Sequence, residues 1–329
     1  MITATDLEVR AGARTLLSTE GSALRVQPGD RIGLVGRNGA GKTTTMRILA
    51  GEGEPYAGSI SRSGEIGYLP QDPREGDLDM LARDRVLSAR GLDTLLADLE
   101  KQQVLMAEVA DDTARDKAVR RYGQLEERFA ALGGYAAESE AGRICASLGL
   151  PERVLTQPLR TLSGGQRRRV ELARILFAAS DGAGGGASSQ TTLLLDEPTN
   201  HLDADSIGWL RTFLQNHSGG LVVISHNVEL LADVVNRVWF LDAVRGEADV
   251  YNMGWQKYLD ARATDEARRR RERANAERKA AALRTQAAKM GAKATKAVAA
   301  QNMLRRADRM IAALDEERVA DKVARIKFP

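Results

Sequence analysis

The segment Gly36-Arg37-Asn38-Gly39-Ala40-Gly41-Lys42-Thr43, followed by Thr44, decides the fold of this chain. It fits the pattern G-x-x-x-x-G-K-[ST] without a mismatch. Glycines let the backbone wrap so that successive N–H groups point at phosphate oxygens, and the helix that follows adds its positive N-terminal end. An apolar run at 31–35 precedes the segment and a helix-compatible run at 44–49 follows it. The sequence therefore predicts a phosphate-binding loop between a strand and a helix.

Each residue type in this loop has a predicted task. The Lys42 ammonium reaches the β- and γ-phosphates of a nucleoside triphosphate, and the Thr43 hydroxyl is a ligand for Mg²⁺. The predicted nucleotide-binding residues are Gly36, Asn38, Gly39, Ala40, Gly41, Lys42, Thr43 and Thr44.

A second segment, Leu193-Leu194-Leu195-Asp196-Glu197, supplies two carboxylates at the end of an apolar run. A carboxylate at the end of a buried strand, here Asp196, can approach the metal. Glu197 is then placed to accept a proton from an attacking water. Together with the phosphate-binding loop, this pair predicts a nucleoside triphosphatase.

The arrangement of apolar residues indicates an α/β fold. Thr192–Leu195 and Leu221–Ile224 are short continuous apolar runs, typical of strands that are buried on both faces of a parallel sheet. Helical spacing of apolar residues over 92–106 and again over 119–132 predicts a helical hairpin. Strands that alternate with helices predict an α/β core, and the Gly/Ser composition of residues 181–190 predicts a flexible surface loop.

Charge is unevenly distributed along the 329 residues. Residues 1–260 carry 29 Lys and Arg against 36 Asp and Glu, a net charge of −7, whereas residues 261–329 carry 19 against 9, a net charge of +10. No acidic residue lies between Arg278 and Ala307. A folded acidic domain followed by a basic arm predicts contact with a polyanion, for which nucleic acid and an anionic membrane surface are the two candidates.

The basic arm has a helical composition. Residues 258–322 are rich in Ala, Arg, Lys and Gln and contain no proline. Met303, Ala307, Met310 and Leu314 form one narrow apolar stripe, which suits one partner helix. We therefore predict two antiparallel helices with a turn near Met290-Gly291.

Several classes of protein are excluded or disfavoured. No apolar run approaches the roughly 18 residues of a spanning helix, and residues 1–6 do not resemble a secretion signal. The single cysteine, Cys145, excludes an intramolecular disulfide and a Cys-based zinc site, and it is expected to be a small buried apolar residue. These features predict a soluble, cytoplasmic protein without membrane spans.

Three further segments carry a family resemblance: Leu162-Ser163-Gly164-Gly165-Gln166, Gly67-Tyr68-Leu69-Pro70-Gln71 and Ser225-His226-Asn227. In this order they resemble the signature motif, Q-loop and switch histidine of ABC-type ATPases. The segments 196–203, with Asn200-His201, and 251–258 resemble the ABC-F group, as do residues 292–297, which are similar to the start of the second linker helix. The resemblance spans nearly the whole chain.

The resemblance implies a P-loop NTPase fold of the ABC type, with a mixed sheet, helices and a helical subdomain at about 78–160. The ATPase domain is expected at 1–257, a two-helix antiparallel basic linker at 258–322, and the start of a missing second ABC domain at 323–329. ATP and Mg²⁺ are the implied cofactors.

The resemblance also implies roles for individual residues. Glu197 is the catalytic base, His226 senses or positions the γ-phosphate, and Gln71 helps to place Mg²⁺ and water. The expected metal ligands are Thr43, Gln71 and Asp196. In this family each nucleotide lies between two domains, so one further set of residues is expected to face the ATP of a second ABC domain or of a homodimer partner. That set is Ser163, Gly164, Gly165, Gln166 and Asp203. Without a facing domain, the chain is expected to bind ATP and hydrolyse it slowly.

The implied function is that of a translation factor or an antibiotic-resistance protein of the ribosome-protection type. In this family the linker reaches toward the tRNA site and the peptidyl-transferase region of the ribosome. The expected contacts to RNA phosphates are Arg284, Lys289, Lys293, Lys296, Arg305 and Arg306. Three alternatives stay open: a linker whose charges serve only solubility, an ATP-binding subunit of a transporter with separate membrane partners, and a non-enzymatic nucleotide-switched scaffold.

The sequence departs from the family pattern in four places. Ala11 stands where an aromatic residue usually stacks on adenine, which puts base selectivity in question. Asn227 replaces the usual acidic residue after His226, and residues 181–190 resemble an insertion. The chain contains one phosphate-binding loop, whereas the family has two ATPase domains.

Overall fold

The fold is taken from a computed structural model that describes residues 1–71, 77–108, 111–180, 191–290 and 301–309. Several predictions fall outside these ranges: the surface loop at 181–190, the RNA contacts of Lys293 and Lys296, the stripe residues Met310 and Leu314, and the segment 323–329.

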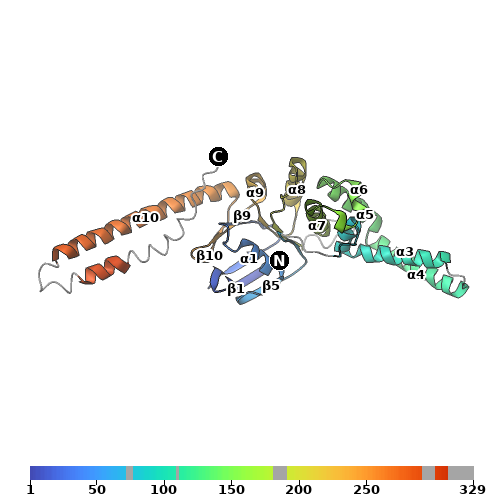
Figure 1. The fold of residues 1–329 in the computed structure, drawn as a ribbon, viewed down its shortest axis with the longest axis horizontal. Coiled ribbons are helices and arrows are strands. Elements are labelled where there is room, and N and C mark those ends of the chain that lie inside the picture. Colours follow the sequence, from blue (N-terminus) through green and yellow to red (C-terminus); the bar gives the residue numbers. More distant parts are fainter. Residues whose placement is uncertain (72–76, 109–110, 181–190, 291–300, 310–329) are drawn as a thin grey trace.

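The strands of the described chain form one mixed sheet (Figure 1). They are β1 (Ile2–Ala11), β2 (Arg14–Ser18), β3 (Ala23–Val26), β4 (Arg31–Gly36), β5 (Ala57–Arg62), β6 (Ile66–Leu69), β7 (Thr192–Asp196), β8 (Leu221–Ile224), β9 (Arg237–Asp242) and β10 (Glu247–Tyr251). The strand order is β3-β1-β2-β10-β9-β4-β8-β7-β6, with β5 paired to β1. Neighbours from β9 to β6 run parallel, whereas β1 pairs antiparallel with β2, β3 and β5. The predicted mixed α/β sheet is confirmed.

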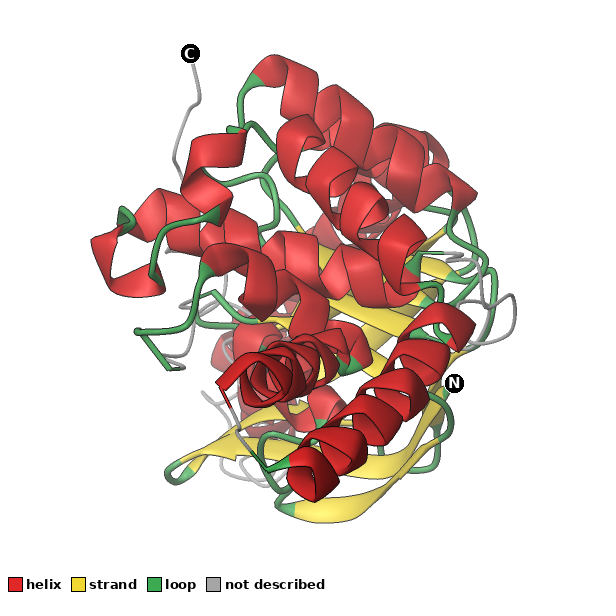
Figure 2. Cartoon of the chain, turned by 90° about the vertical axis from the view of Figure 1, so that its right-hand side faces the viewer, coloured by secondary structure: helices red, strands yellow, loops and turns green. Residues whose placement is uncertain are grey.

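Helices account for the remaining regular structure, and Figure 2 shows the strands below and behind them. They are α1 (Lys42–Ala50), α2 (Ala82–Leu87), α3 (Leu92–Glu108), α4 (Asp112–Ala131), α5 (Gly134–Ser147), α6 (Glu152–Leu155), α7 (Gly164–Ala179), α8 (Ala204–Asn216), α9 (Val228–Val234) and α10 (Trp255–Met290). Short 3-10 turns lie at Ser88–Arg90 and Leu159–Thr161, and residues 301–309 are also helical.

The central strands are buried on both faces, as their continuous apolar sequences predict. Every residue of β7 is buried, but alternate side chains enter different cores. Leu194 belongs to the core formed with β1, β2 and α1, whereas Leu193 and Leu195 belong to the core formed with α7, α8, α9 and the helices between β6 and β7. This alternation follows from the two-residue period of a strand, and it leaves the carboxyl end of β7 between the two layers.

The predicted helical hairpin at 92–132 is present as α3 and α4, which project from the body of the molecule (Figure 1). Leu95 and Phe129 are buried where the hairpin joins the core. Val119 was predicted to lie on the apolar stripe, but it is 47% exposed and its neighbour Ala118 is buried instead. Leu125 and Phe129, which share the predicted helical spacing, are buried, so the stripe differs from the prediction at this position and not along its whole length.

Helix α10 and the helix at 301–309 lie side by side (Figure 1). Arg284 donates a hydrogen bond to Asp308 across 2.8 Å, and the contact between the helices is lined by alanines, of which Ala280, Ala287 and Ala307 are buried. Helix α10 begins at Trp255 rather than at residue 258, because Trp255 and Tyr258 pack into the hydrophobic core of the α/β domain. The first turn of the linker helix is thus part of the folded domain.

Candidate nucleotide site

The predicted phosphate-binding loop joins the end of β4 to the start of α1. Gly41, the residue before α1, has φ +89°, and a Cβ atom there would lie 2.9 Å from the Leu16 Cβ atom, so glycine is required on both counts. The Lys42 ammonium donates to the carbonyl oxygens of Gly36 (2.8 Å) and Arg37 (3.2 Å), which holds it across the loop. Burial lowers the pKa of Lys42, and the charges of Asp196 and Glu197 oppose that effect.

Asp196 ends β7 beside this loop. The residue is 1% exposed, and burial raises its pKa. A hydrogen bond from Thr43 and the charges of Arg168 and Lys42 lower the pKa of Asp196, but by less. Its Oδ2 atom is buried and has no hydrogen-bond partner among the described residues. A buried carboxylate oxygen is costly to leave unpaired, so this atom fits a ligand that the structure does not contain.

The residues around Asp196 match the donor set of Mg²⁺. The described residues contain no group of three or more His, Cys, Asp or Glu side chains that would hold a metal by themselves. Mg²⁺ is commonly bound by one or two carboxylates together with the phosphates of a substrate. The hydroxyl of Thr43 and the free oxygen of Asp196 fit that pattern.

Glu197 has a strained backbone and a mostly buried side chain. Its φ is +51°, which is unusual for a residue other than glycine, and it is 7% exposed. The His226 backbone N–H donates to Glu197 Oε2 at 3.2 Å, and His226 Nε2 lies 3.5 Å from Glu197 Oε1. Burial raises the pKa of Glu197, and the hydrogen bond from the His226 backbone lowers it by less. A carboxylate with a raised pKa is suited to general-base chemistry near neutral pH.

These residues line one cavity of about 570 Å³, a size usual for a small-molecule site. The lining residues are Ala11, Arg14, Leu16, Asn38, Gly39, Gly41, Lys42, Thr43, Thr44, Gln71, Asp196, Glu197, Ile224 and His226. Of the predicted nucleotide-binding residues, Gly36 and Ala40 do not line the cavity. Ala40 is buried, and a Cβ atom on Gly36 would lie 2.7 Å from the Leu241 carbonyl oxygen, so both shape the loop from behind.

The signature residues lie outside this cavity. Ser163 caps α7 in a capping box, because its hydroxyl accepts from the Gln166 backbone N–H (3.2 Å) while the Gln166 side chain accepts from the Ser163 N–H (2.9 Å). Gly164 is exposed, and Gly165 lies against His201. Asp203 caps α8 by accepting from the Ser206 N–H at 2.9 Å. The structure therefore places the predicted partner-facing residues apart from the chain's own phosphate-binding loop.

Arg168 was missed as a site residue, although it connects the predicted motifs. This arginine of α7 is 6% exposed and donates to the carbonyl oxygens of Asp196 (2.7 Å) and Glu197 (3.1 Å). It also donates to the carbonyl oxygens of Pro70 (3.2 Å) and Gln71. One guanidinium thus joins the Q-loop segment to the end of β7. The available sequence signal was an arginine within an otherwise apolar helical face.

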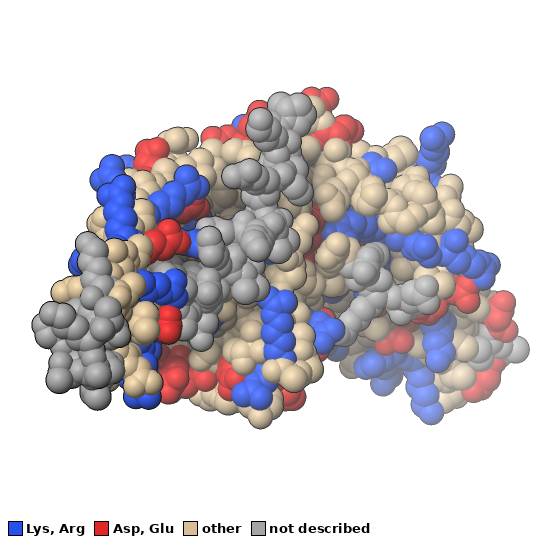
Figure 3. Space-filling model, turned by 60° about the vertical axis from the view of Figure 1, so that its left-hand side comes forward, with Lys and Arg blue, Asp and Glu red and all other residues tan. Residues whose placement is uncertain are grey.

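The basic hairpin carries the predicted RNA contacts that are described. Arg305 and Arg306 are exposed, whereas Arg284 forms the ion pair with Asp308. Lys289 lies near the end of α10. In the view that brings the hairpin forward, basic side chains are interspersed with acidic ones (Figure 3).

Comparison with known proteins gives matches along the chain. Two family models, each described as ABC transporter, match residues 19–200 and 241–328. The chain is 35% identical to the tylosin resistance ATP-binding protein TlrC of Streptomyces fradiae over 256 residues, which are 76% of this chain and 44% of that protein. It is 35% identical to the energy-dependent translational throttle protein EttA of Escherichia coli K12 over 236 residues, which are 71% of this chain and 40% of that protein.

A solved structure shows the same fold. The ATP binding subunit of an ABC transporter matches with a TM-score of 0.53 and 18% identity, over 77% of this chain and 90% of that one. The chain spans less than half the length of the curated relatives named above. Over the residues that the structure describes, no helix combines the length and the apolar character needed to cross a membrane.

Proposed function

Because this chain belongs to the ABC family of ATPases, with curated relatives of the ABC-F type, we propose that it binds and hydrolyses ATP and acts on the ribosome. The observation that supports the ATPase reaction best is the single cavity lined by Lys42, Thr43, Asp196 and Glu197. It unites a phosphate-binding loop, a buried unpaired carboxylate oxygen and a carboxylate with a raised pKa.

The residues have separate roles in this proposal. Lys42 and the N–H groups of the loop bind the phosphates, and Glu197 accepts a proton from the attacking water. His226 holds Glu197 through its backbone N–H, and its side chain, which is largely exposed and lines the cavity, positions the γ-phosphate. Thr43, Asp196 and Gln71 would hold Mg²⁺, which when bound would supply neutralising charge on the phosphates.

Hydrolysis is expected to be slow for the isolated chain. Ser163, Gly164, Gly165, Gln166 and Asp203 lie outside the cavity, so we propose that they complete the nucleotide site of a second ABC domain or of a homodimer partner. Catalysis of phosphoryl transfer depends on alignment of the reacting groups and on stabilisation of charge in the transition state. Without the facing domain, the site lacks part of the groups that provide each.

We therefore expect a verified monomer to bind Mg·ATP but to turn it over at least about tenfold more slowly than a dimeric or two-domain relative, since one lost charge-stabilising contact costs that much or more. Steady-state phosphate release, measured together with light scattering across protein concentration, checks this. A specific rate that rises with dimer formation supports the proposal. A monomer that matches a two-domain relative contradicts it.

We propose the ribosome as the target on two grounds. Relatives that share this region are named for translational throttling and for resistance to tylosin. The hairpin also presents the exposed arginines Arg305 and Arg306 on the helix at 301–309, which lies apart from α1 (Figure 1). Structured RNA is recognised largely through its backbone and shape, which suits cationic helices. Both a role in routine translation and one in antibiotic resistance fit such a target.

Binding to ribosomes should be sensitive to salt. Each phosphate contact makes the slope of log K against log salt concentration more negative by about 0.7 to 0.9. The double variant Arg305→Ala/Arg306→Ala should therefore bind more weakly, and its slope should be less steep by about 1.4 to 1.8. Co-sedimentation of ATP-loaded protein with 70S particles over a salt series measures both quantities.

The matched control for this experiment is Arg25→Ala/Arg47→Ala, which removes two exposed arginines from the cassette rather than from the hairpin. The control should sediment as the wild type does. A flat salt dependence, or equal loss in both double variants, would leave the hairpin charges with a role in solubility only. Recovery of the protein with membranes instead of ribosomes would favour a transporter subunit.

A further inference from the structure

The nucleotide cavity has a second end that the phosphate-binding residues do not fill. It is lined by Ala11 from β1 and by Arg14 and Leu16 from β2. Once the phosphates of a nucleoside triphosphate lie on the loop at 36–43, the base must extend toward this end of the same cavity. Among the described residues that line the cavity there is no Phe, Tyr or Trp, and the imidazole of His226 lies beside Glu197 rather than at this end, so the base meets no large aromatic ring here.

Arg14 is held in place by the β9–β10 hairpin. Its Nη2 atom donates to the Ala243 carbonyl oxygen at 3.0 Å, in the turn between the two strands. The same turn is joined to β2 by a hydrogen bond of 2.5 Å from the Ser18 N–H to the Gly246 carbonyl oxygen. The guanidinium is therefore fixed against a neighbouring strand pair, although it lies at the surface.

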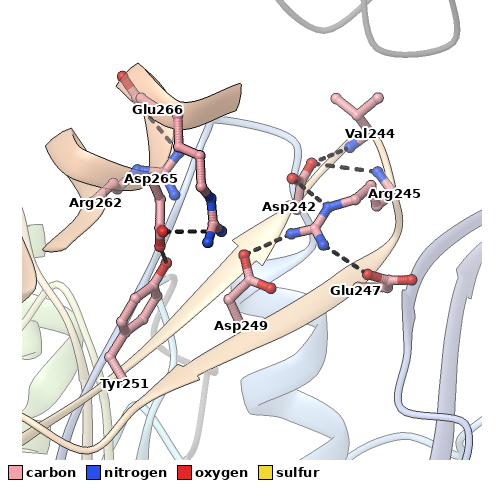
Figure 4. Close-up of polar contacts among 10 residues, drawn as sticks. Asp242, Val244, Arg245, Glu247, Asp249, Tyr251, Arg262, Asp265 and Glu266 are labelled. Carbon is pink, nitrogen blue, oxygen red and sulfur yellow. Dashed lines mark hydrogen bonds and ion pairs between the residues drawn. The ribbon is translucent and has the colours of Figure 1, made fainter. Parts of the chain in front are cut away.

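The turn itself is fixed by one ion-pair cluster (Figure 4). Arg245 contacts Asp242 at 2.9 Å, Glu247 at 2.9 Å and Asp249 at 2.6 Å, all within the hairpin. The Asp242 carboxylate also accepts from the Val244 N–H at 3.0 Å, which tightens the turn that carries the Ala243 carbonyl. This cluster holds in place the turn whose Ala243 carbonyl oxygen accepts the hydrogen bond from Arg14.

A guanidinium that donates a hydrogen bond does so in its own plane, so both of its flat faces stay available. A flat cation stacks well on an aromatic ring system, and every nucleobase has such a face. Leu16 adds an apolar contact between this end and the phosphate loop, where it already packs against Gly41.

We propose that the base of the bound nucleotide stacks on the Arg14 guanidinium beside Leu16, and that this end accepts adenine and guanine almost equally. Ala11 and Leu16 offer no side-chain hydrogen bond, and Arg14 offers donors only, so no side chain in this group accepts from a base amino group. Sites that do not hydrogen-bond the distinguishing group discriminate weakly. This inference rests on the proposed nucleotide site and specifies which triphosphates it takes.

The test compares three ligands on the full chain by calorimetry: Mg·ATP, Mg·GTP and Mg·tripolyphosphate. The wild type should bind ATP and GTP with Kd values within about threefold of each other. Arg14→Ala and Arg14→Lys should each weaken the binding of both nucleotides by about 2- to 5-fold, because both lose the planar stacking contact, and should leave tripolyphosphate binding unchanged. The lysine variant keeps the positive charge but lacks the planar guanidinium, so it separates stacking on the base from electrostatic attraction to the phosphates. Arg25→Ala, an exposed arginine on β3, is the control and should change none of the three.

The outcomes separate this inference from the proposed function. Binding of neither nucleotide nor tripolyphosphate by folded wild-type protein would overturn the proposed function. Unchanged nucleotide affinity in folded Arg14→Ala, equal weakening of tripolyphosphate, or full affinity in Arg14→Lys would overturn the stacking role alone. A preference of more than tenfold for GTP that Arg14→Ala removes would show edge-on contact with guanine, which also overturns it.

Discussion

Glu197→Gln is expected to reduce the rate of ATP hydrolysis by about 10²- to 10⁴-fold, because the variant removes the proposed general base. Binding of Mg·ATP should survive, since the phosphates are held by Lys42 and the loop and glutamine has nearly the same shape as glutamate. Single-turnover hydrolysis of radiolabelled ATP measures the chemical step, and calorimetry on the same sample measures binding. Glu229→Gln, an exposed acid two residues into α9, is the matched control and should hydrolyse ATP as the wild type does.

The pH dependence gives a second readout of the same residue. Burial raises the pKa of Glu197, so the acidic limb of the rate profile should lie above the ordinary glutamate value of about 4.3. A group whose pKa is raised on folding stabilises the fold below its unfolded pKa, and that contribution is lost as pH rises through the folded pKa. At neutral pH, Glu197→Gln should therefore melt no lower than the wild type. Wild-type turnover in the folded Gln variant would exclude Glu197 as the base.

Release of the Glu197→Gln variant from ribosomes should distinguish a factor that hydrolyses ATP from a scaffold that only responds to nucleotide binding. If hydrolysis drives release, Glu197→Gln protein with ATP should stay bound to ribosomes through a dilution that frees the wild type. If the chain is only a scaffold that responds to nucleotide binding, both proteins should release alike, and the sedimentation assay above would show it.

The sequence predicted the structure best where neighbouring residues along the chain determine the local conformation. The loop at 36–43 was predictable because its glycines are needed for particular backbone conformations, such as φ +89° at Gly41. The strand at 192–195 was predictable because burial on both faces requires a continuous apolar run. On α4 the buried residue is Ala118 and not the predicted Val119, because helical spacing alone does not decide which of two adjacent apolar residues faces the core.

Contacts between segments distant in sequence were beyond prediction. Arg168 lies 28 residues from Asp196 along the chain and about 100 from the Q-loop, and nothing in its local sequence shows which carbonyl groups it meets. The partner of Arg14 is equally remote, since Ala243 is brought to it only by the pairing of β10 with β2. The anchoring of Trp255 in the core likewise depends on tertiary packing, which the composition of the linker does not show.

Arg168→Ala is expected to destabilise the fold by about 3–5 kcal/mol, because it removes a buried charge-assisted donor and leaves several carbonyl oxygens without it. Arg168→Lys should recover only part of this, since one ammonium cannot span carbonyl groups on two segments as a guanidinium does. Chemical denaturation measures the free energy of unfolding of both variants. Arg167→Ala, the neighbouring arginine, is the control and should lie within about 0.5 kcal/mol of the wild type.

Arg168 should affect catalysis indirectly, because it positions the backbone of Gln71 and Glu197. We expect folded Arg168→Lys to lower kcat by about tenfold with a smaller change in KM, because it loosens Gln71 and Glu197 without touching the phosphates. The double variant Arg168→Lys/Glu197→Gln should then hydrolyse ATP hardly more slowly than Glu197→Gln alone, since residues that act as a unit are not additive. Fully additive losses would show that Arg168 acts independently of Glu197, and an unchanged kcat in folded Arg168→Lys would assign Arg168 to stability only.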